Sequence, residues 1–156
     1  MPVEIERKFV VVSDDWRAIA KPAQALRQGY LSVTPERTVR VRTRGDSGWV
    51  TIKGRGAGAR RPEFEYAIPH HEAMEILDTL ALRPLVEKLR YRVPIGQHIW
   101  EVDVFGGANQ GLIVAEVELS HEDEPIELPS WVGREVTADP AYANAALVRA
   151  PFNTWN

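Results

Sequence analysis

Charged and apolar side chains alternate near the start of the chain, in Glu4-Ile5-Glu6-Arg7-Lys8. Because successive side chains of an extended strand point to opposite faces, Glu4, Glu6 and Lys8 would share one face. Two carboxylates beside an ammonium can bind a divalent cation and an anionic ligand by oxygen ligation and charge-assisted hydrogen bonds. The pattern gains weight because later segments repeat it with charges of a single sign.

The later charged segments are separated by sign. Three are acidic and two are basic: Glu63/Glu65, Glu101/Asp103 and Glu116/Glu118, then Arg40/Arg42/Arg44 and Lys88/Arg90/Arg92. For any one strand the simpler interpretation is a sheet with one face in water, which also gives apolar–polar alternation. A solvated face usually intersperses the two signs, however, because like charges repel across strands. The separation of sign therefore favours charged faces that point into an interior.

The alternation predicts eight strands, and apolar periodicity predicts helices between and after them. We expect a helix over residues 70–80, a short one from an N-cap at Ser13 to Ala20, and one opened by Asp139-Pro140 that ends near Arg149. Eight strands can close into a barrel, which removes sheet edges. The predicted fold is mainly β (α+β), a closed eight-stranded antiparallel β-barrel with a few flanking helices. The strands are expected over residues 2–12, 25–33, 37–44, 49–53, 62–68, 86–93, 98–105 and 112–119.

Inward-facing charges would give the barrel a polar lumen. Burying uncompensated charge is costly, so such a lumen would hold water, metal ions or a polyanion. A chain of phosphates fits, with cations on its oxygens and carboxylates on divalent ions. The predicted lumen contains Glu4, Glu6, Glu63, Glu65, Glu101, Asp103, Glu116 and Glu118, opposed by Lys8, Arg40, Arg42, Arg44, Lys53, Lys88, Arg90 and Arg92.

Length and composition set broader bounds. With 156 residues the chain is expected to be one domain, residues 1–156. It has no cysteine and no long apolar run, which favours a cytoplasmic protein without a membrane span, and its four histidines lack zinc-like spacing. A net charge of −3 argues against general nucleic-acid binding. The glycine-rich stretch 54–59 lacks the lysine and hydroxyl residue of a nucleotide-binding loop. A homodimer is a possible assembly.

Taken in order, these segments resemble the motifs of CYTH domains, the triphosphate tunnel metalloenzymes. Glu4 to Lys8 is similar to the family's ExExK signature, and the resemblance covers nearly the whole chain. Each motif alone is weak, but the ordered set is specific. The further motifs are Gln28-Gly29-Tyr30-Leu31, Arg40 with Arg42, Thr51-Ile52-Lys53-Gly54, Glu63-Phe64-Glu65, Lys88-Leu89-Arg90-Tyr91, Glu101-Val102-Asp103-Val104-Phe105, Gly111-Leu112 and Ala115-Glu116-Val117-Glu118-Leu119.

The resemblance implies an eight-stranded tunnel and metal-dependent chemistry on a triphosphate. It implies one or two divalent ions, Mg²⁺ or Mn²⁺, held by Glu4, Glu6, Glu63, Glu65, Asp103, Glu116 and Glu118. Phosphate would be bound by Lys8, Arg40, Arg42, Lys53, Lys88 and Arg90. Lys8 and Tyr30 are the catalytic candidates, for positioning the attacking water or accepting its proton.

The function we expect is hydrolysis of the terminal phosphoanhydride of inorganic tripolyphosphate, giving pyrophosphate and phosphate. The expected partner is the small-molecule triphosphate substrate. Alternatives within the same family are a thiamine-triphosphatase, a nucleoside-triphosphatase, an RNA 5′-phosphatase and a class IV-type adenylate cyclase. A polyphosphate-binding module without catalysis is the non-enzymatic alternative. A sandwich whose charged face lies in solvent is the structural one.

Overall fold

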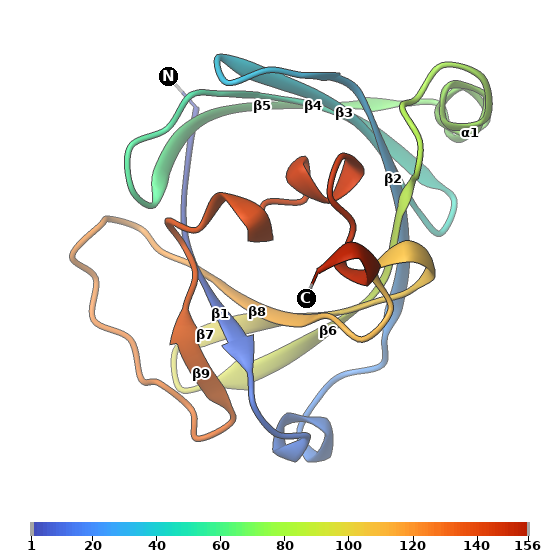
Figure 1. The fold of residues 1–156 in the computed structure, drawn as a ribbon. Helices are drawn as coiled ribbons and strands as arrows, with labels where there is room; N and C mark the ends of the chain where they lie inside the picture. Colours follow the sequence, from blue (N-terminus) through green and yellow to red (C-terminus); the bar gives the residue numbers. More distant parts are fainter. Residues whose placement is uncertain (1, 156) are drawn as a thin grey trace.

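Eight strands close into an antiparallel barrel in the computed structural model, which describes residues 2–155 (Figure 1). The strand order is β5-β4-β3-β2-β6-β7-β8-β1, and pairing of β1 with β5 completes the ring. The predicted fold is therefore confirmed. The strands are β1 (Val3–Val11), β2 (Gln24–Val33), β3 (Arg37–Arg44), β4 (Ser47–Gly54), β5 (Arg60–Ile68), β6 (Val86–Ile95), β7 (His98–Phe105) and β8 (Ile113–Glu118).

The register of the ladders places the charged residues of neighbouring strands side by side. Lys8 of β1 pairs with Glu116 of β8, and Arg90 of β6 pairs with Asp103 of β7. Directly paired residues project on the same face of a sheet, so each pairing carries the charged face to the next strand. The charged faces line the lumen, as the alternation predicts.

The main hydrophobic core lies outside the barrel wall, on the faces opposite the charges. Trp100 and Val102 of β7 and Phe9 of β1 point outward and are almost fully buried. They are covered by Trp16, on the 3₁₀ turn η1 (Asp15–Ala18), and by Trp131, next to the short strand β9 (Val132–Glu135). The Trp100 and Trp131 rings meet edge to face, with centroids 5.7 Å apart. Burial of these aromatic side chains fixes the outer surface of β1, β7 and β8.

Helix α1 (His70–Thr79) covers a different part of the wall. Its Ala73 and Leu77 pack on Val41 of β3, and both are fully buried. A Cβ at Gly48 would lie 2.7 Å from the Cβ of Ala73, so glycine there lets the helix approach β4 closely. Figure 1 shows α1 outside the ring of strands.

Two predicted helices are wrong. The segment after Ser13 forms only η1, a single turn that presents one tryptophan. The segment from Asp139 to Arg149 forms two 3₁₀ turns, η3 (Pro140–Tyr142) and η4 (Ala146–Val148), because Ala143 between them is extended. Asp139 does cap η3 as predicted, accepting a hydrogen bond from the Ala141 amide at 3.1 Å. Strand β9, η2 (Gly107–Asn109) and η5 (Phe152–Thr154) were not predicted.

The C-terminal segment, residues 139–155, closes one end of the barrel. Its Leu147 and Val148 are buried against Tyr30 of β2 and Phe105 of β7, whose side chains face the lumen. In Figure 1 this segment, drawn in red, lies within the ring of strands. The lumen is thus apolar at the closed end and charged beyond it. No helix among residues 2–155 has both the length and the apolar character that a membrane crossing needs.

Trp100→Ala should lower the free energy of unfolding by about 3–5 kcal/mol, because it empties a fully buried site between two aromatic rings. Urea denaturation followed by circular dichroism measures this. Tyr66→Ala is the matched control, since Tyr66 is exposed on the outer face of β5, and it should stay within about 0.5 kcal/mol of the parent. Equal losses in the two variants would contradict a core outside the wall.

Candidate active site

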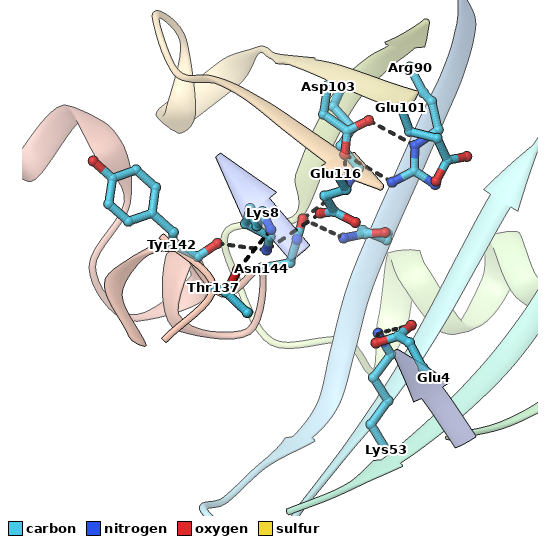
Figure 2. A network of polar contacts seen from close by, with 12 residues as sticks. Glu4, Lys8, Lys53, Arg90, Glu101, Asp103, Glu116, Thr137, Tyr142 and Asn144 are labelled. Atoms are coloured by element: carbon cyan, nitrogen blue, oxygen red, sulfur yellow. Dashed lines mark hydrogen bonds and ion pairs between the residues drawn. The ribbon is translucent and has the colours of Figure 1, made fainter. Parts of the chain in front are cut away.

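Asp103 is the most enclosed charged residue of the lumen, with no exposed surface. Arg90 Nε and Nη2 donate to its two carboxylate oxygens at 2.8 and 2.9 Å (Figure 2). Lys88 Nζ lies 2.6 Å from Asp103 Oδ2. Burial alone would raise the pKa of Asp103, but the two cations hold it below its usual value. Burial lowers the pKa of Lys88 to about 8, although the Asp103 carboxylate opposes this. Both oxygens of Asp103 are therefore committed to cations of β6.

Lys8 and Glu116 form a second buried pair, with Nζ 3.4 Å from Oε1. Burial would lower the pKa of Lys8, but the neighbouring Glu116 and Glu6 carboxylates raise it, so the ammonium is charged. The carboxyl group of Glu6 lies beside this pair, and burial and the negative charge of Glu116 raise its pKa well above the usual range. A buried carboxyl that ionises with difficulty beside another carboxylate is a place where a cation would be stabilised.

The third group lies on β1, β4 and β5. Lys53 Nζ contacts both oxygens of Glu4 at 3.0 Å and approaches Glu63 at 3.5 Å. The Lys53–Glu4 pair stands apart from the Lys8 and Asp103 groups in Figure 2. The positive charge of Lys53 opposes the effect of burial on Glu4, whose pKa is nevertheless raised.

Glu65 and two arginines of β3 form the fourth group. Glu65 accepts a hydrogen bond from Thr51 at 2.8 Å and lies 3.8 Å from Arg40 and 3.5 Å from Arg42. The Nε atoms of both arginines are buried and have no hydrogen-bond partner within residues 2–155. Burial, Arg40 and Arg90 together lower the pKa of Arg42 to about 10. Clustered guanidinium groups with free donors favour an anion that can accept several hydrogen bonds.

A cavity of about 620 Å³ reaches the Lys8 group and the Lys53 group. Its inner wall includes Glu4, Glu6, Lys8 and Lys53. Its outer rim carries further cations from separate segments, so the approach to the lumen is mostly positive: Arg37, Arg55, Arg61 and Arg149. The volume lies within the range of small-molecule sites.

Most of the predicted site residues line one lumen. Glu118 is exposed at the end of β8, and Tyr30 faces the apolar, closed end of the lumen and not its charged part. The seven predicted metal ligands pair mainly with cations, and residues 2–155 contain no group of three or more acidic or histidine side chains already in ligating geometry.

Three contributors to the lumen were not predicted as site residues. Asn144 Oδ1 accepts hydrogen bonds from Lys88 Nζ and Gln28 Nε2, and the Tyr142 carbonyl accepts one from Lys8 Nζ. Gln28 could have been found, because it alternates with Tyr30 on β2. Asn144 and the Tyr142 carbonyl carry no comparable signal, because their positions depend on how the C-terminal segment folds back.

Comparison with known proteins gives consistent results. The CYTH domain model matches residues 2–144. An inorganic triphosphatase of Acetivibrio thermocellus is 45% identical over 155 residues, covering 99% of each chain. One of Nitrosomonas europaea is 40% identical over 150 residues, covering 92% of this chain and 95% of the relative. A crystal structure of an inorganic triphosphatase, 34% identical over 95% of both chains, superposes with a TM-score of 0.66.

Asp103→Asn should destabilise the protein by about 3–5 kcal/mol, because it leaves Lys88 and Arg90 buried without their counter-charge. The folded pKa of Asp103 lies below 3.8, so its stabilising effect is present above pH 3.8 and is lost as the pH falls through the folded value. Denaturation experiments at pH values from 7 to 3 should therefore show that the difference in unfolding free energy between the parent and Asp103→Asn becomes smaller below pH 3.8. Glu101→Gln, at a half-exposed residue 3.5 Å from Arg90, is the control and should cost less than about 1 kcal/mol.

Proposed function

Because this chain belongs to the CYTH domain family, we propose that it is an inorganic triphosphatase that cleaves tripolyphosphate into pyrophosphate and phosphate. The relatives that match it over nearly their full length carry that activity in their names. The observation that carries the proposal is the arrangement of charge in the lumen. Cations of β3, β4 and β6 lie beside carboxylates of β5, β1 and β7, respectively, within one lumen.

The lumen cations are the proposed phosphate-binding groups. Arg40 and Arg42 have buried donors without partners, which suits the many oxygens of a triphosphate. Lys53 lies on the inner wall of the cavity that reaches the surface. With Lys8, Lys88 and Arg90 they complete the set of six expected from the motifs. Several donors fixed on a rigid barrel hold a flexible polyanion in one geometry, which is how proximity lowers a hydrolysis barrier.

The carboxylates of β1 and β8 are the proposed site for a divalent cation. Glu6 and Glu116 provide hard oxygen donors of the kind that Mg²⁺ and Mn²⁺ prefer, and burial together with the charges of Glu116 and Glu4 raises the pKa of Glu6. Glu4, Glu63, Glu65 and Glu118 are proposed as further ligands or as partners of water around the ion. The contacts of Asp103 favour a role in holding Lys88 and Arg90 in place over a role as a metal ligand. A bound divalent ion would neutralise phosphate charge and lower the pKa of nearby water.

The proposed reaction is in-line attack of water on a terminal phosphorus. One P–O bond forms from water, the anhydride P–O bond to the leaving pyrophosphate breaks, and the proton of water is released. Lys8 carries a full positive charge, so in that form it donates hydrogen bonds and orients the attacked phosphate. Tyr30 lies at the apolar end of the lumen, where its ring forms part of the end wall. A role for either residue as the proton acceptor stays a prediction.

The setting proposed for the enzyme follows from its composition. The proposed location is the cytoplasm, because a chain without cysteine needs no disulfide and is stable in a reducing compartment. The proposed assembly is a homodimer. Size-exclusion chromatography with light scattering tests the assembly.

Tripolyphosphate should release phosphate in the presence of Mg²⁺ or Mn²⁺, and a chelator should abolish the release. Pyrophosphate, ATP and thiamine triphosphate are assayed in parallel, and the ATP samples are also analysed for cyclic AMP. Preference for tripolyphosphate by about tenfold or more in kcat/KM supports the proposal. Preference for ATP or thiamine triphosphate would mean that the enzyme acts on that substrate and not on tripolyphosphate. Tight binding of tripolyphosphate without any product would mean that the protein is a binding module and not an enzyme.

Glu116→Ala should reduce metal-dependent turnover by at least about 100-fold, because it removes both a candidate ligand and the counter-charge of Lys8. Initial rates over a metal titration test this, with circular dichroism to confirm the fold. Glu122→Ala, at an exposed residue paired with Arg60 on the surface, is the control and should retain the parent rate. Unchanged turnover and metal dependence in Glu116→Ala would refute the assignment of Glu116.

A further inference from the structure

The ammonium of Lys88 has two partners that come from different parts of the chain. Asp103 Oδ2 of β7 lies 2.6 Å away and Asn144 Oδ1 of the C-terminal segment lies 3.0 Å away. An ammonium carries three N–H groups in a tetrahedral arrangement. When two of them are held, the direction of the third is fixed. With Asp103 alone, the ammonium could rotate about that single contact.

Asn144 is itself held from a second direction. Gln28 Nε2 donates to the same Oδ1 atom at 3.1 Å, and the Gln28 side chain is completely buried. The carbonyl oxygen of Asn144 therefore lies between an amide of β2 and an ammonium of β6. This arrangement fixes the amide of Asn144 and gives it a role beyond covering the end of the barrel.

Lys8 repeats the arrangement seen at Lys88. It has Glu116 as a partner on the neighbouring strand and the Tyr142 carbonyl, two residues before Asn144, as a partner on the C-terminal segment. Figure 2 shows Tyr142 and Asn144 on either side of Lys8. Two lysines on different strands thus each take one acceptor from residues 142–144.

The C-terminal segment is anchored firmly enough to impose these contacts. Leu147 and Val148 are buried between strands β2 and β7, and the amide of Phe152 donates to Asn109 Oδ1 at 2.8 Å. Phe152 also packs edge to face with Trp155. These contacts hold the segment at η4 and after it.

We propose that Asn144 is a positioning residue, which orients the Lys88 ammonium so that its remaining N–H points at a phosphate oxygen of the substrate. The inference deepens the proposed function and rests on it. On this view the C-terminal segment is part of the substrate-binding wall. Because Asn144 orients the phosphate-binding group of Lys88, loss of Asn144 weakens binding of the substrate and of the transition state alike. KM therefore changes more than kcat.

The test begins with Asn144→Ala and Asn144→Leu. Both remove the acceptor, and leucine restores nearly the original volume, so a loss shared by the two variants comes from the acceptor. We expect a rise in the KM for tripolyphosphate of about tenfold, the order of one hydrogen bond to a charged group, with kcat changed less than threefold. Calorimetric titration of tripolyphosphate in chelator should show a matching loss of affinity. Asn153→Ala, at an exposed position of the same segment, should leave both quantities unchanged.

A double-mutant cycle then tests whether Asn144 acts through Lys88. In a Lys88→Met background the Asn144→Ala change should have no further effect on tripolyphosphate affinity, measured in chelator up to millimolar ligand. A loss that persists in that background would overturn the proposal. So would parent-like or tighter binding by Asn144→Ala, because tighter binding would mean that the segment competes with the substrate. If the parent protein releases no phosphate from tripolyphosphate, the proposed activity fails, while the binding cycle still decides the role of Asn144.

Discussion

The structure depends on burying many charged side chains in one lumen, most of them beside a side chain of opposite charge. An unpaired buried charge costs several kcal/mol, so every strand must place its charged residues within reach of opposite ones. The group around Asp103 shows how this is achieved, since a fully buried carboxylate meets a lysine and an arginine of the adjacent strand. The antiparallel register brings opposite charges together, because Arg90 is directly paired with Asp103 and Lys8 with Glu116. A shift of one residue would place these charges against the outer core.

The polar lumen also explains why the hydrophobic core lies outside the wall. A small barrel usually fills its interior with apolar side chains, but here the interior is given to charge. Apolar burial must then come from elements laid against the outer face, namely α1, η1 and β9. Among residues 2–155 it is the C-terminal segment that enters the ring, at the end where Tyr30 and Phe105 make the lumen apolar. The fold thus separates stability, which comes mainly from the outer surface, from a lumen suited to polyanion chemistry.

On the proposed function, the ion pairs of the lumen would exchange partners with a ligand. Lys53 rests on Glu4, and Arg40 and Arg42 lie beside Glu65, so each cation has a carboxylate that a phosphate oxygen would replace. The released carboxylates would in turn be available to a divalent cation. A triphosphate and its metal entering together therefore keep the charge balanced, and the protein need not leave any group uncompensated. On the proposed function, this balance would explain the sorting of acidic and basic residues onto different strands.

The sequence by itself determined the barrel, the eight strands and the faces that carry charge, because a period of two is a local property that each strand expresses on its own. It also indicated Glu6, Lys8, Arg90 and Glu116, whose place in the lumen follows from that alternation and the resemblance to CYTH domains. Only the tertiary structure decided which cation meets which carboxylate, since register depends on turns and packing. It alone decided that residues 139–149 are not a helix and that Asn144 contacts Lys88. Those contacts join residues more than 50 positions apart, and no local pattern encodes a contact between segments that only the closed barrel brings together.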